Sequence, residues 1–381
     1  MLPSLSSQMR TFALHPSNQL KLIMKTSELI KLRLHNLHIS QQVHETPAAI
    51  VAELGMVQAQ DYAAAKWTIG SRLQGSTDRQ IEAALNNRAI VRTWALRGTL
   101  HILAAPDIRW ILGLAAARMT SLYASHYRRL GIDAIVMNKT VKLFVKAMEG
   151  GQQLTRKEIA VLLEKKGIAT GDMRLSFMLL RAALDGIICF GARRNKEFTF
   201  TLLDEWVAPT PAKTEEEAMA TLALKYFTSH GPATLQDFAW WSGLTLAQVK
   251  TAMGAIASEL EAISIDKQTY WMRPVQSSIQ NAGGIYLLAG FEEYLLAYAD
   301  RNLVLEKEHS PHAIGKNGLF HPTIINKGII SGVWRRSVKK DGLYIDVKSF
   351  SSFTNAQKQA ISVKAKNFAK FIEQPLVRVD Y

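Results

Sequence analysis

Apolar residues recur at helical spacing in three successive stretches of the chain, and in each of them residues of strand type follow the helices. The stretches cover residues 26–150, 151–208 and 213–275, and a Pro-Thr-Pro linker at 209–211 separates the last two. Helices joined by a turn and followed by a two-stranded wing are the order of a winged helix. The pattern therefore predicts an α+β protein built from tandem winged-helix (helix-turn-helix) units.

Helix-start signals place the elements of the first unit. Thr46, which is followed by a proline, predicts a helix over residues 47–54. Two further helices are predicted over 62–73 and 78–86. A single strand is predicted over 92–103, because apolar and polar residues alternate there.

The second unit has the clearest boundaries. Glu158 follows Thr155 by three residues, which is the spacing of a capping box and predicts a helix start. A second helix is predicted over 174–185, and strands over 187–193 and 197–203 form the wing. The third unit repeats this order.

Residues 280–381 change character and predict a basic β-rich C-terminal module that ends in a helix over residues 355–371. Its strands are predicted over residues 283–288, 319–325, 328–334 and 343–350. Residues 1–25 contain scattered polar groups and no sustained apolar core, so we expect an N-terminal extension rather than a signal peptide.

The chain carries a formal charge of +14 with a pI near 9.7, which favours a polyanionic partner. Over residues 316–381, twelve Lys or Arg stand against four Asp or Glu, so +8 of that charge is local. The one cysteine, Cys189, excludes an intrachain disulfide and is expected to be a buried apolar residue. No run approaches the roughly 20 apolar residues of a membrane span. We expect no membrane contact and a cytoplasmic, nucleoid-associated protein.

Gln58 and Gln60 are the first candidates for chemistry. They are two residues apart, so in an extended segment both side chains point the same way. Each carboxamide offers a donor and an acceptor, and together they could hold one water molecule. The alternative is hydrogen bonding within the turn before the helix that starts at Tyr62. Asp61 is expected to cap that helix rather than act as an acid or base.

Arg97, Thr99 and His101 would share one face of the strand predicted over 92–103. A guanidinium, a hydroxyl and an imidazole in that arrangement suit contact with a DNA phosphate or an extruded nucleotide. The alternative is a solvated polar face in which Arg97 pairs with a carboxylate and His101 is packed.

Two further groups of residues are candidates for DNA contact. Arg194 and Lys196 lie in the short basic tip of the second wing. Trp334, Arg335 and Arg336 close a predicted strand, and an aromatic ring beside two guanidiniums suits base and backbone contact. The alternative for the latter is an arginine pair on a solvated hairpin.

Neither a metal ion nor an organic cofactor is expected. His309, His312 and His321 match no standard zinc spacing. The chain has no GxGxxG after a strand, no P-loop and no GxSxG elbow.

Five motifs in this order resemble the AlkZ-like DNA glycosylase family, from about residue 27 to the C-terminus. They are Gln58-Ala59-Gln60, Arg97-Gly98-Thr99-Leu100-His101, Asp237-Phe238-Ala239-Trp240-Trp241-Ser242-Gly243-Leu244, Glu292-Glu293-Tyr294-Leu295-Leu296 through Asp300-Arg301, and Gly332-Val333-Trp334-Arg335-Arg336. The resemblance implies tandem winged helices and excision of N-alkylated purines, with interstrand crosslinks unhooked by some members. The family's catalytic Gln-aliphatic-Gln motif falls on Gln58 and Gln60. One departure is Glu292, where the family usually has Asp.

The sequence thus predicts a monomeric, monofunctional DNA glycosylase that acts on double-stranded DNA with alkylated bases. Gln58 and Gln60 would position water at C1′. The alternative is a non-enzymatic winged-helix DNA-binding protein such as a transcriptional regulator, which would prefer one sequence and would not need the glutamines.

Overall fold

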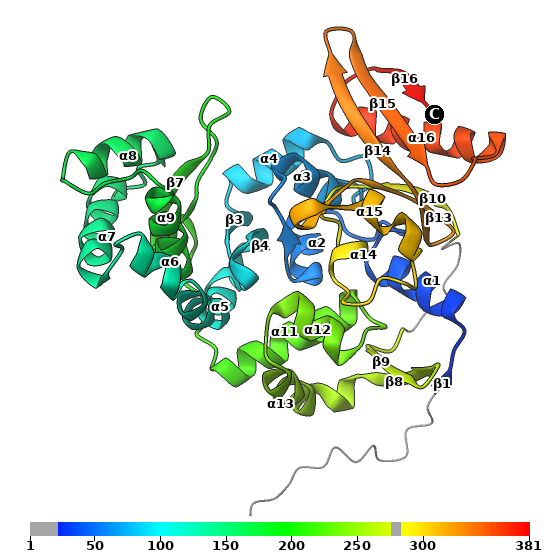
Figure 1. Ribbon diagram of the computed structural model, residues 1–381, viewed down its shortest axis with the longest axis horizontal. Helices are drawn as coiled ribbons and strands as arrows, with labels where there is room; N and C mark the ends of the chain where they lie inside the picture. The colour runs from blue at the N-terminus through cyan, green and yellow to red at the C-terminus, as the bar shows by residue number, and fades with distance from the viewer. Residues whose placement is uncertain (1–21, 276–282) are drawn as a thin grey trace, which may run out of the picture.

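A computed structural model describes residues 22–275 and 283–381, so most of the expected N-terminal extension lies outside the described residues. Three winged helices follow one another along the chain, and a C-terminal sheet packs against the first of them (Figure 1). Among the described helices, none has the length and apolar character needed to cross a bilayer.

The first and second units share one topology, in which a short strand after the first helix joins the wing. In both, the last strand is central, with sheet orders β2-β4-β3 and β5-β7-β6. The elements of the first unit are α2 (Pro47–Leu54), β2 (Val57–Gln58), α3 (Tyr62–Gly70), α4 (Asp78–Asn86), β3 (Ile90–Trp94) and β4 (Leu100–Ala104). Those of the second are α7 (Ala134–Met148), β5 (Leu154–Thr155), α8 (Arg156–Glu164), α9 (Arg174–Leu184), β6 (Ile188–Phe190) and β7 (Thr199–Leu202).

The predicted caps are present. Thr46 accepts a hydrogen bond from the Ala49 amide at the start of α2, and Asp61 accepts one from the Ala64 amide at the start of α3. The Thr155–Glu158 capping box opens α8. These local bonds explain why the helix starts could be predicted from sequence alone.

The third unit has a reduced version of the same plan. Its first strand is a single bridge between Ala233 and Trp271. Its other elements are α11 (Glu215–Ser229), α12 (Leu235–Ser242), α13 (Leu246–Ile256), β8 (Glu261–Ile265) and β9 (Gln268–Met272). Strand β1 (Leu22–Ile23) adds to β8 in parallel. The helices α1 (Thr26–Asn36), α5 (Ile108–Leu122), α6 (Ala124–Arg129) and α10 (Leu203–Trp206) connect the units.

The C-terminal module is a five-stranded sheet of order β10-β13-β14-β15-β16 that packs against a long helix. Its elements are β10 (Ile285–Leu288), β13 (Thr323–Asn326), β14 (Ile329–Lys339), β15 (Gly342–Ser349), α16 (Asn355–Phe371) and β16 (Leu376–Asp380). The sequence did not predict β16, and it joined the separate strands β12 (Leu319–Phe320) and β13. Gly70 of α3 permits a close approach of α16, because a Cβ there would lie 2.2 Å from the Phe371 ring.

Three large apolar clusters form the core. One runs through both the first unit and the C-terminal sheet, and a second joins α5 to the third unit. The third belongs to the second unit together with α6. Cys189 is buried as predicted, and burial raises the pKa of its thiol. The division into five domains remains a proposal, since one core is shared by two of them.

The strand predicted over residues 92–103 is wrong. The chain reverses between β3 and β4, and the two strands pair with each other as a hairpin. Arg97 and Gly98 occupy the turn with φ angles of 61° and 69°, a region that only glycine enters without cost. Arg97 therefore lies in a wing turn and not on a strand face.

Candidate active site

Gln58 lies in β2, at the edge of the first wing. It pairs with His101 on β4, so the two side chains emerge on the same face of the sheet. Gln58 is only 7% exposed, and its Oε1 accepts a hydrogen bond of 3.1 Å from Nη2 of Arg97. The carboxamide oxygen of Gln58 therefore lies in a polar environment, beside the Arg97 guanidinium.

Gln60 follows β2 and is exposed. The backbone between the two glutamines continues the strand pairing, since the Ala59 amide donates to the Leu100 carbonyl at 2.7 Å. The Gln60 side chain adds the next rung, because its Oε1 accepts a 2.9 Å hydrogen bond from the Leu100 amide. This bond crosses to β4 and is not a bond within the turn before α3, whose cap is Asp61.

These two contacts fix how the carboxamides are turned. A guanidinium and a backbone amide can only donate, so each glutamine must direct its oxygen toward them and its Nε2 away. Within residues 22–275 and 283–381, neither Nε2 group donates to a protein acceptor. The motif therefore offers a ligand two N–H donor groups, while both carbonyl oxygens are already occupied.

Arg97 joins the first unit to the third. Its Nη1 donates to the carbonyl oxygens of Trp240 and Trp241, at 3.2 and 2.6 Å, at the C-terminal end of α12. Cations are favoured at helix C-termini, where the carbonyls carry partial negative charge. Burial lowers the pKa of Arg97 from its usual value, although the charge of Glu293 opposes this. The Arg97 guanidinium therefore bonds at the same time to Gln58 of the first unit and to the end of α12 in the third unit.

The structure brings Thr99 and His101 near Arg97, but not as predicted. His101 is 1% exposed, and its Nδ1 donates to the Thr99 carbonyl at 2.9 Å. Burial, and secondarily the charge of Arg97, lowers the pKa of His101 to about 4. The imidazole is therefore neutral at physiological pH. In this arrangement His101 is packed and offers no positive charge to a phosphate, which favours the packed alternative.

Behind Arg97 lies a buried carboxylate, Glu293 of α14 (Glu293–Leu296). It accepts a 3.0 Å hydrogen bond from Nε1 of Trp241 and lies 3.4 Å from Nε2 of His230. Burial opposes its ionisation, but these neighbours and the charge of Arg97 lower its pKa below the usual value. The anion balances Arg97 from within the core. The adjacent Glu292 pairs separately with Arg72 at 2.6 Å.

The role of Arg92 was not predicted from the sequence. This buried side chain reaches from β3 to the Ala59 carbonyl, with Nε at 3.3 Å and Nη2 at 3.0 Å. Its guanidinium also lies over the rings of Phe190 and Phe198 from the second unit, at 4.6 and 4.4 Å. Arg92 therefore fixes the residue between the two glutamines and connects it to the second wing.

Trp240 is a second residue that sequence reasoning left without a role. It is 49% exposed, although its Nε1 donates to the Leu296 carbonyl at 3.0 Å. Arg301 covers one side of the indole at 5.1 Å. A tryptophan that is held at its edge and open to solvent can stack on a nucleobase. The only sequence signal was a Trp-Trp pair on a helix, whose members face about 100° apart.

The tip of the second wing is exposed. Arg194 pairs there with Glu158, and Lys196 has a φ of 70° in the turn. The positive charge of Arg194 is thus partly balanced, whereas no ion pair is recorded for Lys196 in the described structure.

Trp334 is not available to DNA, which corrects its assignment as a contact residue. It is 2% exposed, its Nε1 donates to the Leu288 carbonyl at 2.8 Å, and its ring packs edge-on against Phe368. Trp334 is the last of three consecutive buried residues of β14, and Arg335 and Arg336, which follow it, are exposed.

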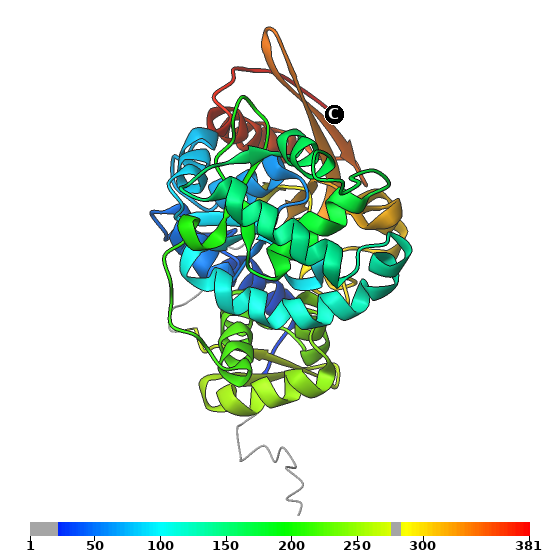
Figure 2. The ribbon, with the colours of Figure 1, turned by 90° about the vertical axis from the view of Figure 1, so that its left-hand side faces the viewer.

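The basic elements project on one side of the fold. In Figure 1 the β6–β7 wing and the long β14–β15 hairpin extend upward, and α3 and α4 lie between them. Seen from the side, the hairpin again rises above the rest of the chain (Figure 2). The glutamines belong to the unit between these two projections.

Tandem winged helices around such a polar centre define the chain as a winged-helix protein of α+β class. The family model for DNA glycosylase AlkZ-like proteins matches residues 51–371. The chain belongs to the AlkZ-like DNA glycosylase family and is a DNA glycosylase, so the regulator alternative is not supported.

Two comparisons from Streptomyces sahachiroi extend this result. The chain is 26% identical over 329 residues to an interstrand DNA cross-link repair glycosylase, and the match covers 82% of this chain and 88% of that protein. It is also similar to the solved structure of the DNA glycosylase AlkZ, with a TM-score of 0.76 at 21% identity. That match covers 94% of this chain and all of the other. At this identity the structural likeness supports the fold.

Proposed function

We propose that this protein is a monofunctional DNA glycosylase that hydrolyses the N-glycosidic bond of N-alkylated purines in double-stranded DNA. Gln58 and Gln60 position the attacking water at C1′. The observation that carries the proposal is the fixed orientation of the two carboxamides, whose oxygens are held by donor-only groups while their Nε2 groups remain free of protein acceptors in the described chain.

Two outward N–H groups suit the positioning of a water molecule. A water that accepts one hydrogen bond from a glutamine Nε2 keeps a lone pair for the anomeric carbon. The second Nε2 can donate to an oxygen of the sugar-phosphate backbone. Because Arg97 and the Leu100 amide hold both carboxamides in place, little reorganisation is needed when the lesion arrives.

The reaction does not require a strong acid in the protein. An N7-alkylated purine is cationic, so the glycosidic bond breaks with its electron pair moving to the base, which leaves neutral. Water then forms the new C1′–O bond and loses one proton to solvent. The charged intermediate resembles that of glycosidases, which use paired carboxylates because their leaving groups need a proton.

The groups near the glutamines also support a mechanism without covalent catalysis. Lys66 is buried, and its Nζ is bonded to Asp78 at 2.7 Å and to Glu82 at 2.8 Å. An ammonium held by two carboxylates is a poor nucleophile. Asp61 is the acidic residue nearest in sequence, and its Oδ1 accepts a hydrogen bond from the Ala64 amide.

DNA binding is assigned to the exposed basic residues on the two projections, namely Arg194, Lys196, Arg335 and Arg336, with Thr99 nearer the glutamines. Arg97, which bonds to Gln58 and to two backbone carbonyls, is assigned to positioning instead. Contacts of this kind position the duplex through its phosphates and carry little sequence information. The Streptomyces sahachiroi relative is described as a cross-link repair enzyme, so we include interstrand crosslinks among the candidate substrates. Exposure of Gln60 supports this, because a lesion need not be fully enclosed to reach it.

The decisive experiment is release of free base from methylated duplex DNA. The full-length protein should liberate 7-methylguanine and leave abasic sites regardless of sequence, and borohydride should trap no protein–DNA adduct. Absence of base release with intact DNA binding would refute the proposal, and a trapped adduct would refute its monofunctional part. A parallel assay with a crosslinked duplex decides whether crosslinks are also substrates.

A further inference from the structure

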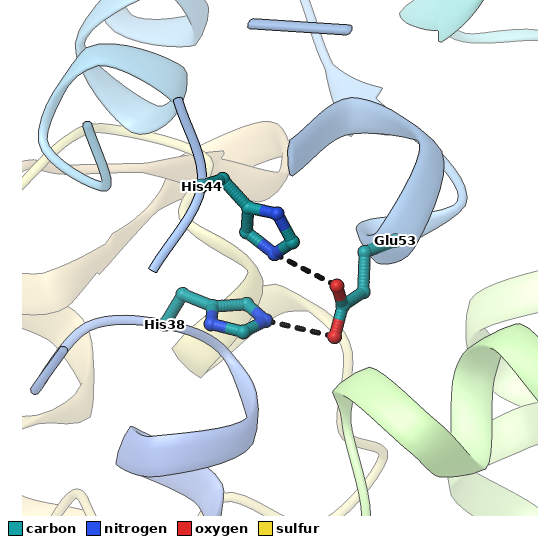
Figure 3. Close-up of side chains that lie close together, drawn as sticks. All are labelled: His38, His44 and Glu53. Carbon is teal, nitrogen blue, oxygen red and sulfur yellow. Dashed lines mark hydrogen bonds and ion pairs between the residues drawn. The ribbon is translucent and has the colours of Figure 1, made fainter. Parts of the chain in front are cut away.

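We propose that His38, His44 and Glu53 form a binding site for a divalent transition-metal ion, with Zn²⁺ as the best-matched ion. The site lies in the first winged-helix region but does not include the glutamines. His38 follows α1, His44 precedes α2, and Glu53 belongs to the last turn of α2 (Figure 3).

The three side chains converge on one point. Nε2 of His38 is 2.9 Å from Glu53 Oε1, and Nε2 of His44 is 2.7 Å from Oε2. One ligand atom from each residue lies within 4.8 Å of the other two. Figure 3 shows both imidazoles directing Nε2 at the same carboxylate, and their rings meet edge-on at 4.7 Å.

Ion pairing accounts for this cluster only if both imidazoles share one carboxylate. Nε2 of His44 lies 2.7 Å from Oε2 of Glu53, and this contact is an ion pair only if the imidazole is protonated. The atom is buried, so in a neutral imidazole that carries its proton on Nδ1 the Nε2 lone pair faces a carboxylate oxygen. Such an imidazole nitrogen, aimed into a cluster of ligand atoms, is the arrangement that a metal ion would complete.

The donor set matches zinc. Two imidazole nitrogens and one carboxylate oxygen are a known three-residue zinc set, with a fourth position left to water. Ligands about 2.0–2.2 Å from one Zn²⁺ lie roughly 3.4 Å apart in a tetrahedron, so shifts of about 1 Å would admit the ion. The side chains of His44 and Glu53 are 18% and 33% exposed, which leaves an open side for that water.

Two nearby basic side chains, Lys225 and His35, contact other groups rather than Glu53. Lys225 of α11, which packs against α2, donates to the Ala52 carbonyl at 2.6 Å and lies 3.1 Å from Asp107. His35 is near His38, and Gln41 contacts its Nε2 at 3.1 Å. Bound metal would tie the segment between α1 and α2 to the helix that directly precedes Gln58, and so would stabilise the first unit.

The site is tested by measuring Zn²⁺ binding to full-length, chelator-treated protein by equilibrium dialysis with metal analysis. One equivalent should bind, and Co²⁺ should give the visible absorption of a tetrahedral site. His44→Asn and Glu53→Gln should each lower the affinity at least tenfold, consistent with loss of one ligand. Zn²⁺ should raise the melting temperature of the unaltered protein and not that of the variants.

His309→Asn is the matched control, because His309 also lies beside a glutamate, Glu306, at 3.4 Å. This variant should keep the full equivalent of Zn²⁺. Circular dichroism of the metal-free variants establishes that they fold. Less than one equivalent at saturating Zn²⁺, or unchanged binding in both site variants, would overturn the proposal. Base release does not enter this test, so its outcome is separate from that of the proposed function.

Discussion

The first and second wings have the same strand order but opposite surroundings. The turn of the first wing is held by Arg97, which bonds to Gln58, Trp240 and Trp241. The tip of the second wing is exposed and carries Arg194 and Lys196. One topology therefore provides a fixed turn that can orient a reactive group and a free tip that can meet a phosphate. Variants of the first wing should therefore lower the rate of base release, whereas variants of the second wing should lower the affinity for DNA.

The largest effect is expected at the glutamines. Gln58→Ala combined with Gln60→Ala should reduce the single-turnover rate of base release by roughly 100-fold or more, the usual cost of removing a positioned donor. Affinity for undamaged DNA should change less than about twofold, since neither residue is charged. Rates at saturating protein and fluorescence anisotropy measure the two quantities.

Gln374→Ala is the control, because Gln374 is exposed and far along the chain from the motif. It should behave as the unaltered protein. A double glutamine variant that releases base at the normal rate would show that Gln58 and Gln60 take no part in catalysis.

Arg97→Lys should come next. The lysine keeps the charge but cannot bond to Gln58 and to both tryptophan carbonyls together. We expect the rate at saturating DNA to fall about tenfold, and stability to fall by about 2 kcal/mol through loss of charged hydrogen bonds. Chemical denaturation and single-turnover kinetics are the measurements. A loss confined to DNA affinity would show that Arg97 is a phosphate contact and not a positioning residue.

His101 gives the first wing a histidine with a shifted pKa, whereas residues 151–208 of the second unit contain no histidine. Its folded pKa of about 4 lies below the unfolded value of 6.5, so the unfolded chain binds more protons between these values. Stability is fully present above pH 6.5 and is lost as the pH falls toward 4. The cost at pH 5 is on the order of 2 kcal/mol.

Urea unfolding at pH 7.5 and pH 5 tests this expectation. His101→Asn should show a smaller drop between the two pH values than the unaltered protein. Equal drops in both proteins would mean that His101 is not held neutral in the fold.

The smallest effect on chemistry is expected at the free tip. Arg194→Ala with Lys196→Ala should weaken DNA binding several-fold and reduce the salt dependence by about 0.9 per lost phosphate contact. The rate at saturating DNA should be unchanged. Because Arg194 already pairs with Glu158, Lys196 should account for most of the loss. A slower rate at saturation would show that the second wing also acts on the chemistry, for example through Arg92.

The sequence predicted the helices well because their starts are encoded locally. Thr46, Asp61 and Thr155 each bond to an amide three residues away. The order of helices and wing strands followed from apolar spacing, and the family model confirmed the class of protein that the motifs had indicated. The β3–β4 reversal was missed because apolar alternation continued through the turn, and the single glycine there was interpreted as a strand residue.

The amino-acid sequence by itself determined the winged-helix order, the basic character and the pair of glutamines, since these depend on local spacing and composition. Only the tertiary structure decided that Arg97 would reach Trp240, 143 residues away, that Arg92 would hold Ala59, and that Trp334 would be buried. It also gathered His38, His44 and Glu53, whose spacing matches no metal motif. Local hydrogen bonds and apolar periodicity act within a few residues, whereas these contacts arise from packing between units and leave no pattern along the chain.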